Sequence, residues 1–145
     1  MKYWMAIFNE ETWRDFVAMR VKVCAFSDNP TRRFPTISID DRILCYVAKA
    51  QVWAGLVSVV GERFRANGEQ YPNRIPVKPD IVIADPARGV AMSEMEGKLS
   101  FFPAGGSAKQ WAPHVRISPR VMHIPDAETL ADALKRSAEG DAGGS

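Results

Sequence analysis

Two apolar runs separated by a short polar break constrain this chain more than any other feature. Ile43–Ala48 and Val52–Val60 flank this break, which is formed by Lys49, Ala50 and Gln51. Both runs are rich in β-branched and aromatic residues, and the break is short enough for a β-hairpin. Because nearly every position is apolar, we expect both faces of this hairpin to be covered, as in the wall of a barrel. A buried helix could carry as many apolar residues, but Gly55 and the valines after it favour strands.

The segments around this central hairpin alternate between strand and helix patterns. Asn9 is a good N-cap for a helix over Glu10–Arg20, and Asp126 is expected to cap a last helix. Strands are predicted over 2–8, 22–26 and 75–84, extended segments over 114–118 and 121–124, and a helical turn over 90–96. The pattern predicts the α+β class, with a small, mostly antiparallel β-barrel of five or six strands and flanking helices. Residues 1–138 are expected to form one domain and 139–145 a disordered tail.

Composition narrows the class of protein. The 145 residues, 46% hydrophobic and 25% charged, are typical of one globular domain. No apolar run approaches the roughly 20 residues that span a bilayer, and the N-terminus resembles a first strand more than a signal peptide. Two cysteines fit a reducing compartment. We therefore expect a cytoplasmic protein that does not bind a membrane.

Charge is distributed unevenly along the chain. The net charge is +2, but residues 126–145 carry five acidic and two basic residues, and residues 1–125 carry 12 acidic and 17 basic residues. Arginine dominates the basic residues between 29 and 78, and its planar guanidinium suits bidentate phosphate contacts. This excess permits an anionic partner, although a merely solvated basic surface explains it equally well.

Residues that could support catalysis or metal binding are few. Cys24 and Cys45 with His114 and His123 could supply a nucleophile and a base, but no sequence context assigns these roles. The four residues lack zinc-site spacing, and no glycine-rich loop suits a phosphate. Isolated thiols within apolar runs are more often core residues. We expect neither an enzyme, nor a metal site, nor a cofactor.

Aromatic residues are spread over nearly every predicted element. Most are expected to belong to the core. A few at the barrel mouth could instead stack on a planar base while nearby arginines hold phosphates. Phe26, at the end of a predicted strand beside the Arg32–Arg33 loop, fits both parts of that description.

The order of motifs resembles an EVE domain, a member of the PUA-like superfamily that is also similar to YTH domains. The resemblance covers about residues 2–136. It rests on the Tyr3–Trp4 strand, Asn9–Trp13, Val23–Phe26, Ile39–Tyr46, Trp53–Val59, Tyr71–Arg74, Ile117–Pro119 and Ile124–Pro125. Two positions depart from the family pattern. Asp40 stands where Gly is usual before Asp41, and Cys24–Ala25 stands where many relatives have a Trp, so Phe26 is expected to replace that pocket wall.

The resemblance implies a module that recognises a modified base in DNA or RNA, flipped into an aromatic pocket. The expected base-binding residues are Asn9, Cys24, Ala25, Phe26, Phe64, Tyr71 and Trp53, and the expected phosphate-binding residues are Arg32, Arg33 and Arg74. Asn9 could read a base edge or only cap its helix. An effector nuclease could act as a separate protein. The alternatives are a hydrolase of modified nucleosides, which needs a Lys, Thr or Cys in the pocket, and a protein-interaction domain.

Overall fold

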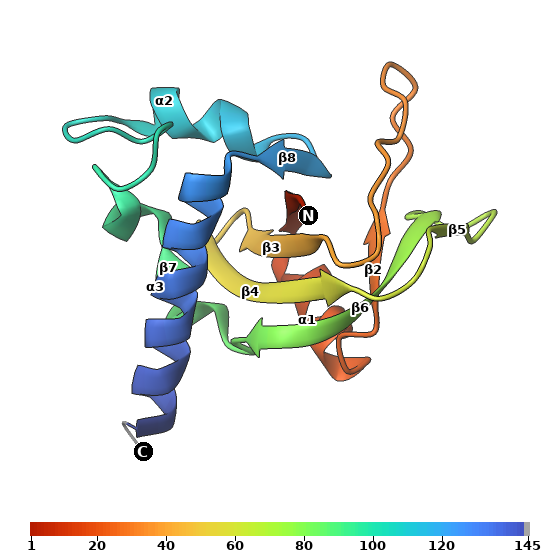
Figure 1. Ribbon diagram of the computed structural model, residues 1–145, viewed down its shortest axis with the longest axis horizontal. Helices are drawn as coiled ribbons and strands as arrows, with labels where there is room; N and C mark the ends of the chain where they lie inside the picture. The colour runs from red at the N-terminus through yellow and green to blue at the C-terminus, as the bar shows by residue number, and fades with distance from the viewer. Residues whose placement is uncertain (144–145) are drawn as a thin grey trace.

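The computed structural model describes residues 1–143 as a curled sheet with helices on both sides (Figure 1). The strands are β1 (Tyr3–Phe8), β2 (Val23–Phe26), β3 (Arg42–Val47), β4 (Val52–Val59), β5 (Phe64–Arg65), β6 (Asn73–Val82), β7 (Val90–Ala91) and β8 (Arg120–Met122). The α-helices are α1 (Glu10–Ala18), α2 (Ala108–Trp111) and α3 (Ile124–Gly143), and the 3-10 helices are η1 (Pro86–Arg88), η2 (Met92–Met95) and η3 (Ala112–Val115). None of these helices is both long and apolar enough to cross a membrane.

The sheet is an open, mixed half-barrel. Its strand order is β2-β6-β4-β3-β1-β8, with β5 added to β6 and β7 to β4. β1 and β3 are parallel, and the other pairs are antiparallel. The expected barrel of five or six strands is therefore corrected in two respects: the described chain has eight strands, and β2 and β8 remain edges. The count differs because β5 and β7, with two residues each, are too short to show a strand period.

The central hairpin is covered on both faces, as the sequence predicts. One face packs with α1, where Trp13 and Phe16 meet apolar side chains from β3 and β4. The other face packs with α3, where Leu130 and Leu134 lie in one cluster with Trp53. The side chains of β3 and β4 are almost all buried, which explains why both runs are apolar at nearly every position.

Helix α1 has well-defined ends. At its start Asn9 Oδ1 accepts a hydrogen bond from the Thr12 N–H at 2.7 Å, and Thr12 Oγ1 accepts one from the Asn9 N–H at 2.9 Å. At its end the Arg20 N–H bonds to the Val17 carbonyl and the Val21 N–H to the Phe16 carbonyl, each at 3.0 Å. This pair of bonds is a Schellman motif, which turns the chain back toward β2.

The C-terminal third differs most from expectation. Residues 112–115, part of which was expected to be extended, form η3, whose early Pro113 suits the start of a helix. Asp126 is not the cap of α3, because the helix begins at Ile124 and the Asp126 carboxylate accepts a hydrogen bond from the Ser100 N–H. Of the expected tail, residues 139–143 continue α3, and residues 144–145 lie outside the described part of the chain.

Candidate functional site

An open groove of about 590 Å³ lies between α1, β2 and the turn that precedes β6; we call it the α1–β2 groove. Its walls come from Ile7, Phe8, Asn9, Thr12, Asp15, Phe16, Met19, Lys22, Val23, Ala25, Ala48, Tyr71 and Arg74. Four residues that the sequence nominates, Asn9, Ala25, Tyr71 and Arg74, are therefore brought together from three separate parts of the chain. Ile7 and Phe8 end β1 and, with Phe16, contribute apolar surface to the groove.

Helical and strand periodicity place the groove residues. Thr12, Asp15 and Met19 are spaced by three and four residues, so one face of α1 carries them along the groove. In β2, Val23 and Ala25 alternate with the buried Cys24 and Phe26. The outward-facing residues of a four-residue strand thus form one wall, while the inward-facing ones belong to the core.

Asn9 serves the helix and still has a free polar group. Its Oδ1 caps α1 through Thr12, but its Nδ2 makes no hydrogen bond to another described residue. The side-chain amide carries two N–H donors on that nitrogen. Capping and base contact, which the sequence leaves as alternatives, are therefore compatible in one side chain.

Tyr71 and Arg74 form the opposite wall. Arg74 lies on β6 directly across from Ala25 of β2, and its Nε donates to the Tyr71 carbonyl at 3.2 Å. Both side chains are half-buried. Tyr71 is the aromatic side chain of this wall, and an aromatic ring of this kind offers a flat face to a planar ligand.

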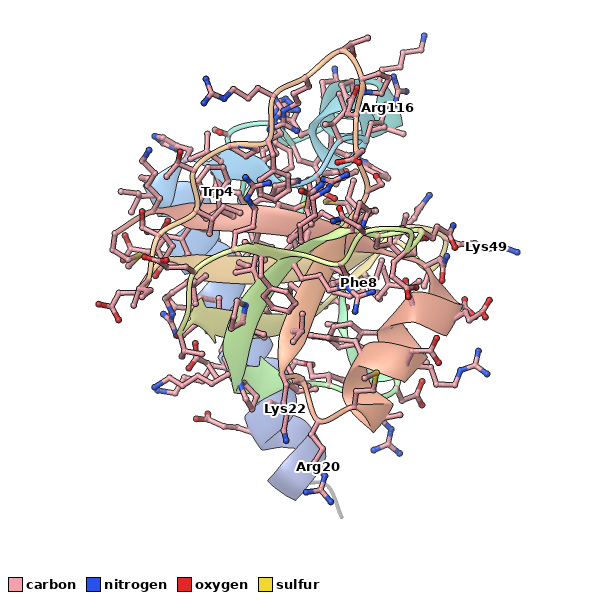
Figure 2. All side chains as sticks on the ribbon, turned by 90° about the vertical axis from the view of Figure 1, so that its right-hand side faces the viewer. Trp4, Phe8, Arg20, Lys22, Lys49 and Arg116 are labelled. Atoms are coloured by element: carbon pink, nitrogen blue, oxygen red, sulfur yellow. The ribbon has the colours of Figure 1, made fainter. Side chains whose placement is uncertain are left out.

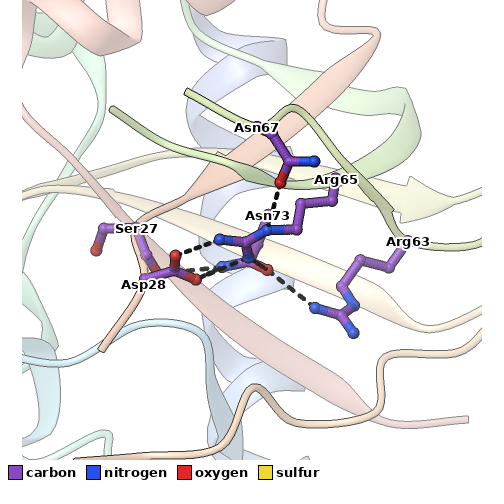
Figure 3. Close-up of polar contacts among 6 residues, drawn as sticks. All are labelled: Ser27, Asp28, Arg63, Arg65, Asn67 and Asn73. Atoms are coloured by element: carbon purple, nitrogen blue, oxygen red, sulfur yellow. Dashed lines mark hydrogen bonds and ion pairs between the residues drawn. The ribbon is translucent and has the colours of Figure 1, made fainter. Parts of the chain in front are cut away.

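A polar network fixes the hairpin that carries Tyr71 and Arg74 (Figure 3). Arg65 holds Asp28 through two hydrogen bonds of 2.6 and 3.0 Å, and the buried Asn73 donates to the same carboxylate at 2.8 Å. Arg63 donates to Asn73 Oδ1 at 2.9 Å. The hydrogen bonds from Arg65 and Asn73 lower the pKa of Asp28 to about 2. The β5–β6 hairpin is thereby attached to the end of β2 beside the groove.

The charge of the groove is mixed, with a basic side. Lys22 and Arg74 line it together with Asp15. Figure 2 shows Arg20 and Lys22 projecting from the same end of the molecule, where α1 returns to β2, and Lys49 projecting near α1. Lys22 and Arg74 place positive charge beside any ligand held in the groove, which contacts to a phosphate backbone require.

Three of the nominated base-binding residues belong to the hydrophobic core instead of the groove. Cys24 and Trp53 are 0% exposed and Phe26 is 3% exposed. Phe26 packs edge-on against Phe34 at 5.8 Å between ring centroids, so it does not replace the family Trp as a groove wall. The inward alternation of β2 accounts for Cys24 and Phe26, and the two-sided cover of β4 accounts for Trp53.

The remaining nominated residues lie outside the groove, on the β2–β3 loop and β5. Phe64 is 47% exposed on β5. Arg32 donates through Nη2 to the Pro119 carbonyl at 2.5 Å, and Arg33 lines two separate hollows beside Phe34. The structure therefore does not bring Arg32, Arg33 or Phe64 together with Asn9 and Tyr71.

Sequence reasoning missed Met19 and Lys22. Met19 is 74% exposed at the end of α1 and lines the groove, where a flexible thioether can adapt to a flat ring. Counting helical steps from Asn9 through Thr12, Asp15 and Met19 would have found this face. No local pattern marks Lys22, whose place depends on the turn after α1.

The groups considered for catalysis do not converge on one site: the two cysteines are neighbours in the core, and His114 and His123 lie elsewhere, on η3 and just before α3. Cys24 and Cys45 are buried, and within the described chain no three His, Cys, Asp or Glu side chains form a metal site. Burial and the neighbouring Cys24 raise the pKa of the Cys45 thiol, which disfavours a reactive thiolate. Thr12 and Lys22 do line the groove, but the Thr12 hydroxyl is engaged in capping α1.

Comparison with known proteins supports the architecture. No protein-family model and no curated protein matches the sequence. The Mmi1 YTH domain in complex with RNA superposes with a TM-score of 0.63 at 10% identity, covering 97% of this chain and 81% of that one. Rpa0253 from Rhodopseudomonas palustris superposes with a TM-score of 0.60 at 12% identity, with 94% of each chain covered. A mutant of ZmASCH from Zymomonas mobilis superposes with a TM-score of 0.52 at 11% identity, covering 91% of this chain and 98% of that one.

The YTH and ASCH neighbours are PUA-like proteins. The chain has a PUA-like fold. At these identities the likeness establishes the fold of the chain and leaves its ligand to be argued from the α1–β2 groove.

Proposed function

We propose that this chain is an EVE-type module that binds nucleic acid and takes a modified base into the α1–β2 groove. The observation that carries the proposal is the convergence of Asn9, Ala25, Tyr71 and Arg74 on one open groove. The Asn9 amide supplies a donor for the base edge, Tyr71 a stacking face, and Arg74 and Lys22 positive charge for phosphates. The YTH domain of Mmi1, which shares the fold, binds RNA.

Edge strand β2 adds backbone groups to the proposed base contacts. The Val77 N–H bonds to the Lys22 carbonyl, so even-numbered residues of β2 direct their backbone groups toward β6. The N–H and C=O of Val23 and Ala25 consequently point away from β6. In the proposal they contact the polar edge of the base. The flipped base loses its stacking and pairing contacts, and no covalent bond is broken.

Binding titrations with oligonucleotides test the proposal. DNA and RNA strands that differ only in one modified base, a methylated or hydroxymethylated cytosine or a methylated adenine, are compared at two salt concentrations. We expect at least tenfold tighter binding of one modified strand, and weaker binding of all strands at higher salt. Equal affinity for modified and unmodified strands at both salt concentrations would contradict the proposal.

Asn9 allows a matched pair of variants. Asn9→Asp and Asn9→Ser keep an N-cap oxygen but remove the amide donor. We expect both to lose about tenfold in affinity for the preferred strand while the thermal midpoint changes little. Asn29→Asp, on the exposed β2–β3 loop outside the groove, is the control and should bind like the original protein. Turnover of a modified nucleoside that Lys22→Ala abolishes would replace the proposal with the hydrolase alternative, and an effector nuclease stays a prediction.

A further inference from the structure

A second cavity, of about 210 Å³, lies beneath β8 and the start of α3. None of the residues that line it also lines the α1–β2 groove. It is bounded by β1, β4, the 99–102 turn, η3, β8 and the first turn of α3, so six parts of the chain converge on it. At about 30 Å³ per water molecule, its volume corresponds to roughly seven waters, a size that suits one planar heterocycle.

The inner wall of this cavity is apolar but holds an unpaired donor. Met5 and Trp53 are 1% and 0% exposed. The Trp53 indole N–H has no hydrogen-bond partner among the described residues. The indole N–H groups of Trp4 and Trp13, in contrast, bond to Asp41 and to the Ile83 carbonyl at 2.9 and 3.1 Å. A buried N–H without an acceptor is costly, and Trp53 is among the residues that line the cavity, so a ligand acceptor that reaches this N–H would relieve that cost.

The mouth of the cavity is polar and carries both signs of charge. The Asp126 carboxylate, 5% exposed, accepts hydrogen bonds from the Ser100 N–H at 2.7 Å and from the Ser100 hydroxyl, and its Oδ2 lies 3.6 Å from His123 Nδ1. Arg120 anchors one guanidinium nitrogen on the Pro113 carbonyl at 3.0 Å. Its other N–H groups provide donors at the mouth.

A flat platform completes the site. The rings of Phe101 and His114 stack at 4.6 Å with 17° between their planes. Burial and the nearby Arg120 lower the pKa of His114, and Asp126 opposes this shift. His114 is therefore neutral at pH 7 and can donate one hydrogen bond and accept another.

We propose that this cavity is a second ligand site and that it binds one nucleotide. The flat, apolar walls take the base, Trp53 and Asp126 supply a donor and an acceptor for its edge, and Arg120 takes the phosphate. The choice of a nucleotide as ligand rests on the proposed function, whereas the site itself rests on the cavity. A free mononucleotide and a nucleotide within a strand share this chemistry.

Indole resonances of ¹⁵N-labelled protein read this site directly. The chain has four tryptophans, and Trp53→Phe identifies the resonance of Trp53. On titration with 5′-CMP and 5′-AMP, and separately with an unmodified hexanucleotide, the Trp53 indole N–H resonance should shift while those of Trp4 and Trp13 stay fixed. A shift with the hexanucleotide alone assigns the site to a strand. No shift with any of the three ligands at millimolar concentration overturns the proposal.

Variants of two arginines in the same segment give the matched control. Arg120→Gln should lower, at least fivefold, the affinity for the ligand that shifts the Trp53 resonance. Arg116 is exposed and lies outside the cavity, so Arg116→Gln should not change this affinity. Equal effects of the two substitutions, with well-dispersed spectra, overturn the nucleotide assignment. Asn9→Asp, which alters only the α1–β2 groove, should leave the Trp53 response intact. The proposal for the second site and the proposal for the groove can therefore be contradicted independently.

Discussion

Two adjacent aspartates show how differently neighbouring residues can act. Asp40 is exposed and has a φ of +76°, a left-handed conformation that glycine adopts without strain. This explains why glycine is usual at its position in the family that the sequence resembles. Asp41 is buried and accepts N–H hydrogen bonds from Lys2, Ser38 and the Trp4 indole, each at 2.9 Å. One residue shapes the turn, and the next ties β1 to β3.

The ionisation of Asp41 should make the free energy of unfolding depend on pH in the acidic range. Burial raises its pKa, but the N–H donors from Ser38, Lys2 and Trp4 outweigh this, so the pKa of Asp41 is lowered overall. A folded-state pKa below the unfolded value of about 3.9 stabilises the fold above that pH, and this stability is lost as pH falls through the folded-state pKa. Urea unfolding should therefore show the free energy of unfolding falling below about pH 4.

Asp41→Asn tests the origin of this dependence. We expect it to lower the free energy of unfolding by about 2 kcal/mol at pH 7, because an amide cannot accept all three hydrogen bonds. The loss should shrink toward pH 2, where the original carboxylate is also protonated. Asp40→Asn, which tolerates the same left-handed backbone, is the control. A constant difference between Asp41→Asn and the original protein from pH 7 to pH 2 would contradict this account.

Arg20 occupies a position that glycine fills more easily. It is the first of two consecutive left-handed residues in the Schellman motif after α1: its φ is +64°, and that of Val21 is +56°. Arg20→Gly should raise the free energy of unfolding by about 0.5–1 kcal/mol in urea titrations, since the relief of strain exceeds the entropy cost of glycine. Arg14→Gly, at an exposed position within α1, should lower the free energy of unfolding by about 1 kcal/mol. Destabilisation by both substitutions would argue against strain at Arg20.

At the scale of elements, α1 depends on a missing side chain in β4. A Cβ at Gly55 would lie 2.8 Å from Trp13 Cη2 and 3.1 Å from the Ile81 carbonyl oxygen. Trp13 is fully buried and its indole donates to the Ile83 carbonyl, so the ring cannot move aside easily. The glycine that interrupts an apolar strand thus lets α1 approach β4 and sets the position of Asn9 at the groove.

Gly55→Ala should therefore destabilise the fold and displace α1, which carries one wall of the groove. We expect a loss of about 1–3 kcal/mol in urea unfolding, from overpacking against Trp13. Gly140→Ala, in α3 with no atom within 4 Å of the added Cβ, is the control and should stabilise by up to about 1 kcal/mol. If Gly55→Ala unfolds at the same urea concentration as the original protein, close packing of α1 on β4 does not limit stability.

The elements that the sequence predicts well are those with long local patterns. The hairpin β3–β4, the strand before Asn9 and the helix after it are confirmed. The expected barrel is an open half-barrel between the edges β2 and β8. The parallel pairing of β1 with β3 could not be predicted, because it joins segments far apart in the chain and no local period encodes it. The outward residues of β2 could not be chosen from four positions alone. Phe26, which the sequence places at the end of a strand beside the Arg32–Arg33 loop, belongs to the core, whereas Val23 and Ala25 line the groove.

At the scale of the whole molecule, the half-barrel ends in two short edge strands, β2 and β8. β2 is a four-residue edge strand paired with β6, whereas β3 lies between β1 and β4. Across the open side, Arg32 of the β2–β3 loop bonds to the Pro119 carbonyl just before β8. Edge strands with few partners open at lower free energy than central strands. The strand that forms one wall of the α1–β2 groove should therefore be among the more mobile parts of the sheet.

The two buried cysteines report on this difference, because Cys24 lies on β2 and Cys45 on β3, both 0% exposed. Single-cysteine variants Cys45→Ala and Cys24→Ala, treated with a thiol reagent under native conditions, measure opening at each strand. We expect the thiol of Cys24 to react at least tenfold faster than that of Cys45, since β2 can detach without global unfolding. In unfolding concentrations of urea both thiols should react equally, which controls for their chemistry. Equal rates under native conditions would mean that β2 opens only when the whole sheet unfolds.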